Sequence, residues 1–89
     1  MKASNPLVSV LMNCHNGEEF LIQSIESILN QSYSNLELIF FDNCSTDNSS
    51  NIINSFKDNR IKYFSSKKKL SLSEARIAAW QHIQGEYVA

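Results

Sequence analysis

The feature of this sequence that most constrains its fold is the regular alternation of short apolar runs with longer amphipathic segments. Residues 7–12 and 36–41 are rich in aliphatic and aromatic side chains, and residues 61–64 form a shorter run. Short apolar runs bounded by turn-forming residues are typical of buried strands. Each run is followed by a segment whose apolar residues recur at helical spacing. The order is therefore strand then helix, three times, and residues 86–89 begin a fourth strand.

Capping residues predict where two of the helices begin and one ends. Asn16 and Glu19 have the spacing of a capping box, which predicts the start of the first helix. Ser71 and Glu74 repeat that spacing at the third helix. Gly85 then occupies the place of a left-handed C-cap that ends the third helix.

Alternating strands and helices predict an α/β fold, with a parallel, doubly wound, Rossmann-like sheet and right-handed crossovers. The 89 residues make one small domain or part of a larger one, so residues 1–89 are treated as a single unit. Ligands of such sheets bind outside the carboxyl ends of the strands. The candidate regions are therefore the loops after Met12 and Phe41, together with whatever follows Ala89.

Composition excludes several classes of function. Eight Lys and Arg residues balance nine Asp and Glu residues, which leaves no electrostatic footprint for nucleic acid. The two cysteines lie far apart and form neither a disulfide framework nor a zinc motif. With two glycines the chain has no glycine-rich phosphate loop. No apolar run reaches the roughly 18 residues of a membrane span, and residues 1–6 lack a signal-peptide core. We therefore expect a soluble, cytoplasmic chain.

The polar segment after the second strand, residues 42–47, is the first candidate site. An N-cap and an Asx turn explain Ser45, Thr46 and Asp47 without any ligand. Asp42 and Asn43 do not serve that cap, and their place at the strand tip favours contact with a ligand.

The tip of the first strand offers Asn13 and His15, and the first turns of the third helix offer Arg76. His15 could stack on a base or donate a hydrogen bond, although a lone histidine in a loop is more often solvated. Lysines 67–69 are interpreted as a solvated loop rather than a phosphate site. Cys14 and Cys44 are interpreted as buried small hydrophobic residues rather than as a catalytic or redox pair.

Four motifs in order resemble family 2 glycosyltransferases, the inverting enzymes of GT-A fold. Residues 8–18 are similar to the opening strand and loop of that family. Residues 26–33, Glu-Ser-Ile-Leu-Asn-Gln-Ser-Tyr, match its "ESILNQTY" segment, and residues 36–47 are similar to "ELIIVDDGSTD". Ala75-Arg76 and residues 85–89 resemble "ARN…GEYIA". The resemblance covers nearly the whole chain.

The resemblance implies the N-terminal part of a hexosyltransferase that binds a nucleotide-diphosphate sugar and transfers the sugar to a hydroxyl of a glycan or glycolipid acceptor. It assigns nucleotide-sugar binding to Asn13, His15, Asp42, Asn43 and Arg76. The family's DxD motif and catalytic base would follow Ala89, so the resemblance places no catalytic or metal-binding residue within residues 1–89. A divalent cation, Mg²⁺ or Mn²⁺, is expected for the full-length enzyme, and these residues alone are expected to be inactive. Polysaccharide biosynthesis at the cytoplasmic membrane face is the expected setting.

Three departures from the family pattern affect the expected site. Asn13 and His15 replace the Thr and Tyr that are common there, and Asn43 replaces the second acid of the pair that reads the base. An amide matches the donor and acceptors of uracil or thymine better than the two adjacent donors of guanine, which favours a UDP or dTDP sugar.

Two other functions compete with the transferase. The first is a non-catalytic nucleotide-binding or protein-interaction module on the same scaffold. The second, a response regulator, fails because the first strand tip carries no acidic cluster and Phe64-Ser65 occupies the phospho-acceptor position.

Overall fold

The structure is a computed structural model that describes residues 6–89. Its elements alternate as the sequence predicts: β1 (Val8–Cys14), α1 (Glu18–Leu29), β2 (Leu36–Asn43), α2 (Ser49–Ser55), β3 (Ile61–Ser66), α3 (Leu72–Trp80) and β4 (Tyr87–Val88).

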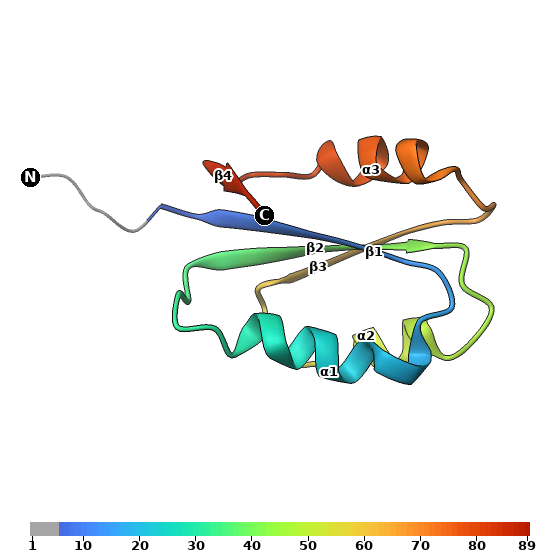
Figure 1. Ribbon diagram of the computed structural model, residues 1–89, viewed down its shortest axis with the longest axis horizontal. Helices are drawn as coiled ribbons and strands as arrows, with labels where there is room; N and C mark the ends of the chain where they lie inside the picture. The colour runs from blue at the N-terminus through green and yellow to red at the C-terminus, as the bar shows by residue number, and fades with distance from the viewer. Residues whose placement is uncertain (1–5) are drawn as a thin grey trace, which may run out of the picture.

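The four strands form one parallel sheet in the order β3-β2-β1-β4. The chain moves outward from β1 through β2 to β3, and then returns to the other side of β1 to form β4 (Figure 1). The strand order therefore reverses at β1, and in open α/β sheets this switch point is where ligands bind. The predicted doubly wound α/β fold is confirmed.

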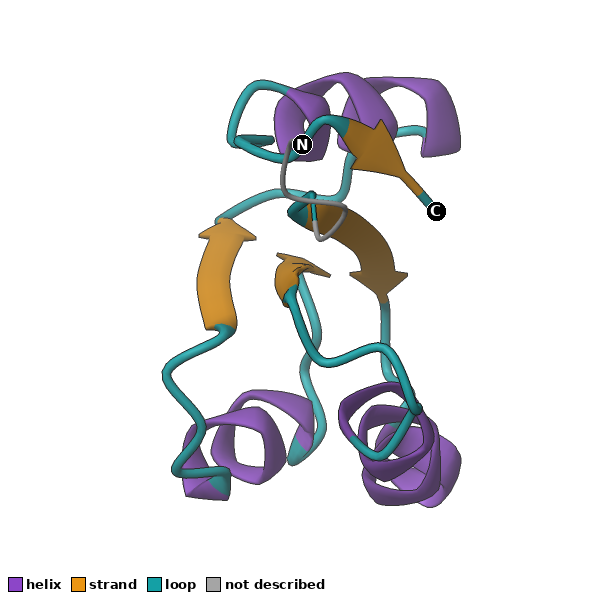
Figure 2. Cartoon of the chain, turned by 90° about the vertical axis from the view of Figure 1, so that its left-hand side faces the viewer, coloured by secondary structure: helices purple, strands orange, loops and turns teal. Residues whose placement is uncertain are grey.

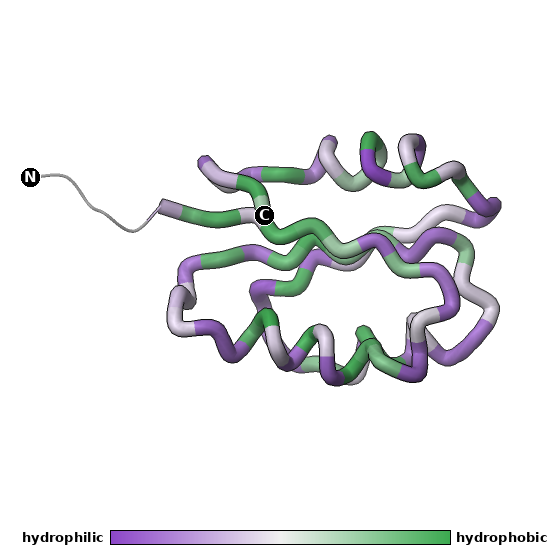
Figure 3. Tube along the Cα trace, in the orientation of Figure 1, coloured by the Kyte–Doolittle hydropathy of each residue, from purple (hydrophilic) through white to green (hydrophobic). Residues whose placement is uncertain are grey.

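Helices cover both faces of the sheet, α1 and α2 on one side and α3 on the other (Figures 1 and 2). All eight residues of β2 are buried because this central strand is covered on both faces and flanked on both edges. Alternate side chains of β2 point to opposite faces of the sheet and pack into two separate hydrophobic cores. One core contains Cys14, Leu21, Ile25, Leu38, Phe40 and Ile53. The other contains Ile39, Phe41, Ala75 and Ala79. The hydrophobic colour follows the strands in Figure 3, and hydrophilic residues gather in the loops beyond β1 and β2.

The two predicted capping boxes have different outcomes. The box at α3 is confirmed: the Glu74 backbone N–H donates to Ser71 Oγ, and the Ser71 N–H donates to Glu74 Oε1 at 2.9 Å. The box at α1 is wrong, because Gly17 occupies the N-cap and the Asn16 side-chain oxygen bonds to Thr46 and Asp47 instead of to the helix. Asn16 has a left-handed backbone, φ 55°, which turns it away from the helix end.

Gly85 does not end α3, because that helix stops at Trp80 and the described glycines have no positive φ. The segment after α3 instead runs back over β1, and Gly85 rests directly on that strand. A Cβ at this position would lie 2.6 Å from Ser9 Oγ and 2.7 Å from the Leu7 carbonyl oxygen. The glycine is therefore required by close approach of two backbones rather than by its dihedral angles.

Replacing Gly85 with alanine should weaken the attachment of β4. The added methyl must displace backbone atoms of β1, so we expect the free energy of unfolding to fall by about 1–3 kcal/mol, the usual cost of overpacking. Urea denaturation measures this. Gly17→Ala is the matched control. A Cβ at position 17 would have its nearest contact with Cys14 Sγ at 3.1 Å, so the loss of unfolding free energy should be smaller. Equal losses in the two variants would contradict the close-approach explanation.

Candidate functional site

The carboxyl ends of β1 and β2 lie side by side, with Cys14 in register with Asp42. His15 joins the two ends, since its Nδ1 lies 2.7 Å from the backbone oxygen of Asn43. A carbonyl only accepts hydrogen bonds, so Nδ1 carries a proton and donates it in this contact. The histidine thus bridges the two strand tips, while its ring remains exposed.

Asn16 makes a second connection between the loops after β1 and β2. Its side-chain oxygen accepts the backbone N–H groups of Thr46 at 2.7 Å and Asp47 at 3.2 Å. Its own N–H donates to Ser45 Oγ at 2.9 Å. Asn16 therefore ties the two loops together instead of capping α1.

Asp47 stabilises the same region from the second loop. Its carboxylate accepts the backbone N–H groups of Ser49 at 2.9 Å and Glu18 at 3.2 Å. Hydrogen bonding from Ser49 is the main cause that lowers the pKa of Asp47 below its ordinary 3.8, and the Glu18 N–H contributes. A structural role for residues 45–47 is confirmed, but they serve both loops, and the N-cap of α2 is Asn48, whose own side chain makes no capping hydrogen bond.

Asp42 faces α1 and α2 rather than α3. Asp42 is 4% exposed, and its carboxylate accepts the Ser45 N–H at 3.0 Å and the Tyr63 hydroxyl at 3.2 Å. Asp42 makes no bond to the start of α2, in line with the expectation that it does not serve the cap, but it holds the turn at Ser45. Burial, followed by the Asp42 charge, raises the pKa of Tyr63.

Asn43 faces α3 and holds the loop that leads into that helix. Its Oδ1 accepts the Leu70 N–H at 2.8 Å, and its Nδ2 donates to the Leu70 carbonyl at 2.9 Å. An aspartate could accept the first bond but has no hydrogen to donate in the second. The departure from an acid at this position thus gives the chain a two-bond clamp on Leu70.

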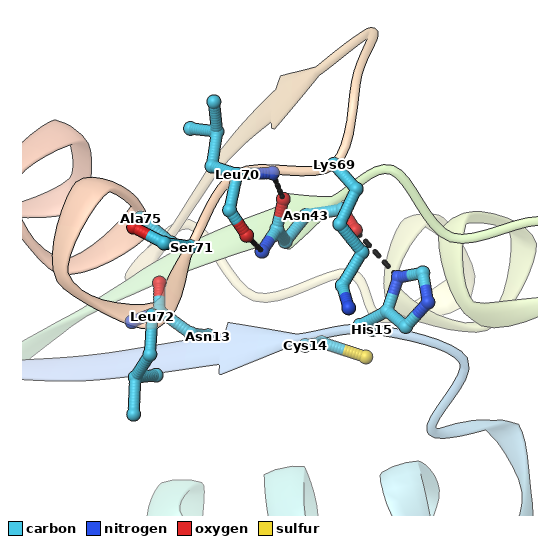
Figure 4. A pocket seen from close by; sticks show the side chains of 9 residues that line it. All are labelled: Asn13, Cys14, His15, Asn43, Lys69, Leu70, Ser71, Leu72 and Ala75. Carbon is cyan, nitrogen blue, oxygen red and sulfur yellow. Dashed lines mark hydrogen bonds between the residues drawn. The ribbon is translucent and has the colours of Figure 1, made fainter.

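A cavity of about 260 Å³ opens at the strand tips beside α3 (Figure 4). Its walls come from the end of β1, the end of β2 and the start of α3. It is lined by Asn13, Cys14, His15, Asn43, Lys69, Leu70, Ser71, Leu72 and Ala75. A neighbouring cavity of about 420 Å³ is lined by Leu11, Asn13, Leu72, Arg76, Trp80 and Ala89. Asn13 lines both cavities.

Asn13 Oδ1 is the one buried side-chain nitrogen or oxygen within residues 6–89 that has no hydrogen-bond partner. Leaving a buried acceptor unpaired costs about 1–3 kcal/mol. The terminal torsion of an asparagine is broad, so this amide can turn toward either cavity. This unpaired buried oxygen, beside two cavities at the switch point, is therefore a candidate contact for a ligand.

The structure brings together part of the predicted site. Asn13, His15 and Asn43 line one cavity, and Arg76 lines the neighbouring cavity with Asn13. The Asp42 side chain does not join them, since it lies on the other face of the sheet. Leu70 and Trp80 also line these cavities and were not predicted. Leu70 had one sequence signal, its place next to the Ser71 cap, whereas Trp80 had none.

The remaining candidates fall outside this arrangement or at its edge. Lys69 lines the first cavity, which the solvated-loop interpretation did not anticipate. Cys14 is buried as predicted, whereas Cys44 is only partly buried and donates its Sγ–H to the Lys67 carbonyl. Across residues 6–89, no three His, Cys, Asp or Glu side chains gather as a metal site requires. No helix in this part of the chain has both the length and the apolar character to cross a membrane.

Comparisons with known proteins agree on one family. Residues 9–89 match the profile of "Glycosyl transferase family 2". An uncharacterized glycosyltransferase of Haemophilus influenzae is 44% identical over 93% of this chain and 34% of its own length. The UDP-Glc:alpha-D-GlcNAc-diphosphoundecaprenol beta-1,3-glucosyltransferase of Escherichia coli is 35% identical over 93% of this chain and 33% of its own length. The chain thus spans about a third of these relatives.

Solved structures with a similar fold are also glycosyltransferases. A mannosyltransferase from Pyrobaculum calidifontis, solved with GDP-Man and Mn²⁺, superposes with a TM-score of 0.86 at 21% identity, over 94% of this chain and 26% of that protein. Further relatives are named for teichuronic acid and colanic acid biosynthesis.

Replacing Asn43 with aspartate should loosen the loop before α3. The variant loses the donor to Leu70 and places a carboxylate against a carbonyl oxygen. Because Asn43 is 6% exposed, we expect the free energy of unfolding to fall by about 1–3 kcal/mol. The control is Asn54→Asp at an exposed position on α2, and chemical denaturation compares them. A loss no greater than that of the control would show that the clamp contributes nothing.

Acid should destabilise the fold partly through Asp47. A carboxyl whose folded pKa is lowered stabilises the fold above its ordinary pKa, 3.8 here, and this contribution is lost as the pH falls through the folded pKa. The thermal midpoint should therefore drop as the pH falls below about 5, and the drop should continue below pH 3.8 as the folded carboxyl is protonated. It should drop less steeply in Asp47→Asn, which has no charge to lose. Identical slopes for the two proteins would contradict this role of Asp47.

Proposed function

The chain belongs to glycosyltransferase family 2, and from this premise we propose that it forms the nucleotide-sugar-binding part of an enzyme that transfers a sugar to an acceptor hydroxyl. The observation that carries the proposal is the unpaired amide of Asn13 between two cavities at the switch point of the sheet. The relatives' names support transferase chemistry, and the glucosyltransferase of E. coli is named for a UDP sugar.

Three side chains are proposed to contact the nucleotide. Asn13 pairs with the edge of the base through its free amide. Arg76 lies one helical turn after Leu72 on an exposed face of α3, and its guanidinium supplies positive charge beside the cavity that it shares with Asn13. His15 presents an exposed ring whose Nδ1 is fixed by Asn43, so the base can stack on it.

Asp42 and Asn43 are proposed to act on the nucleotide site indirectly. Asp42 holds the turn at Ser45 from the far face of the sheet, and Asn43 holds Leu70 at the start of α3. Both polar groups are already paired, so neither needs a ligand to satisfy it. In this proposal they keep the walls of the first cavity in place.

Metal and proton-transfer chemistry are proposed to come from residues that follow Ala89 in the full-length protein. The resemblance to the family implies a divalent cation, Mg²⁺ or Mn²⁺, which would neutralise the leaving diphosphate. The described residues provide no cluster suited to that cation, so no ligand is assigned among them. A carboxylate from the same later region is proposed to take the proton of the acceptor hydroxyl. We accordingly expect residues 1–89 alone to show no transfer activity.

The proposed setting is cell-envelope polysaccharide assembly at the cytoplasmic face of the membrane, with a glycan or glycolipid as the acceptor. Relatives named for teichuronic and colanic acid biosynthesis support it.

Truncating either proposed contact should weaken nucleotide binding in the full-length protein. For Asn13→Ala and Arg76→Ala we expect the Kd for UDP, measured by isothermal titration with Mn²⁺ present, to rise about tenfold, which is 1.4 kcal/mol. Lys67→Ala is the control, because Lys67 is exposed and lines neither cavity. Unchanged affinity in both site variants would overturn the assignment.

The base is expected to be uracil or thymine. Asn43 was the residue from which the sequence suggested this preference, but its amide is paired with Leu70, so the proposal now depends on Asn13. One amide offers a donor and an acceptor to uracil, whereas the two adjacent donors of guanine suit a carboxylate. Competition between UDP, dTDP and GDP for the full-length protein measures the preference. Tighter binding of GDP would contradict it.

A further inference from the structure

Ser9 and Glu37 are polar residues buried at the end of the sheet opposite the candidate site. They are cross-strand partners on β1 and β2, and they are 0% and 3% exposed. Ser9 Oγ donates to Glu37 Oε2 at 2.6 Å. Within residues 6–89 Glu37 forms no ion pair, so hydrogen bonds alone compensate for its burial.

The segment after α3 hydrogen-bonds to Ser9 and Glu37 through two consecutive backbone N–H groups. The Gln84 N–H donates to Glu37 Oε2 at 2.7 Å, and the Gly85 N–H donates to Ser9 Oγ at 2.8 Å. The close fit of Gly85 against Ser9 follows from the same contact. One carboxylate oxygen and one hydroxyl thus hold the segment that connects α3 to β4.

β4 has little else to fix its position. Its two side chains, Tyr87 and Val88, are 63% and 40% exposed and belong to neither core. The backbone bonds between this segment and β1 begin one residue after Gly85, where the Glu86 N–H donates to the Leu7 carbonyl at 2.8 Å. They end where the Leu11 N–H donates to the Ala89 carbonyl at 3.1 Å. The register of β4 is therefore set by the contacts of Gln84 with Glu37 and of Gly85 with Ser9.

We propose that Ser9 and Glu37 form a polar seat that sets the register of β4, and that Glu37 is thereby a positioning residue for the donor site. The link to the site is Ala89, which directly follows β4 and which the seat positions through that strand. Ala89 lines the cavity that also contains Asn13 and Arg76. This last step rests on the proposed function, whereas the seat itself does not.

Amide hydrogen exchange tests the seat without any ligand. Glu37→Met keeps the length of the side chain and removes its acceptors, while Glu37→Gln keeps one acceptor oxygen. In Glu37→Met we expect exchange at Glu86 and Ala89, relative to that at Leu38, to rise about tenfold, the factor expected for one lost buried hydrogen bond. Leu38 is the reference because its N–H donates to the Arg60 carbonyl, away from β4.

The conservative variant and a surface control separate positioning from general destabilisation. Glu37→Gln should restore most of the protection at Glu86 and Ala89, and Glu19→Met, at an exposed position on α1, should leave it unchanged. Equal acceleration at all three amides in Glu37→Met, or none, would overturn the seat. If Glu37→Met does not fold, Ser9→Ala is measured with the same reference, since it removes the acceptor for Gly85.

The second arm measures the Kd for UDP in the full-length protein. Glu37→Met should weaken binding and Glu37→Gln should restore it. Unchanged affinity in Glu37→Met, with β4 exchange accelerated, would overturn the positioning role and leave the seat supported. If the unmodified protein does not bind UDP, the proposed function and the positioning role both fail, and the exchange data still decide whether the seat exists.

Discussion

The parallel pairing of β1 with β2 is the constraint on which the rest of this structure depends. The two strands stay in register from Val8 with Leu36 to Cys14 with Asp42, and every residue of β2 is buried. A central strand covered on both faces can hold polar groups only where they are paired. This is why the polar residues lie at the two ends of the strand pair. Glu37 and Ser9 meet at the amino ends, and the loops with their cavities meet at the carboxyl ends.

The dense polar sequence after β2 is largely a structural device. Asp42 and Asp47 accept backbone N–H groups within their own loop, and Asn16 reaches across from the neighbouring loop. These bonds hold two irregular segments beside each other without an apolar core between them. The groups that remain for a ligand are few, and Asn13 is the one whose buried oxygen is unpaired. A rigid frame around one unsatisfied amide is the arrangement from which nucleotide binding is proposed.

Local patterns in the sequence predicted the order of elements, the parallel sheet and the family. Apolar runs and capping spacings involve residues that are close together in the sequence, so they can be recognised without the structure. The partners of individual polar groups could not be predicted. Asn16 has the spacing of a capping residue, yet it bonds to Thr46, thirty positions away, because the register of β1 and β2 brings the loops together. Gly85 looked like a helix end and is instead a contact with Ser9. Asp42 and Asn43 are adjacent in sequence, but alternation along the strand points them to opposite faces.

We propose that the strand tips beside α3 bind a nucleotide diphosphate. The most direct measurement is backbone NMR of the full-length protein titrated with UDP in the presence of Mg²⁺. We expect saturable shifts concentrated at Asn13, His15, residues 69–72 and Arg76, with little change at the amino ends of the strands. Shifts centred on the opposite end of the sheet, near Glu37 and Arg60, or no saturable shift at millimolar UDP, would contradict it.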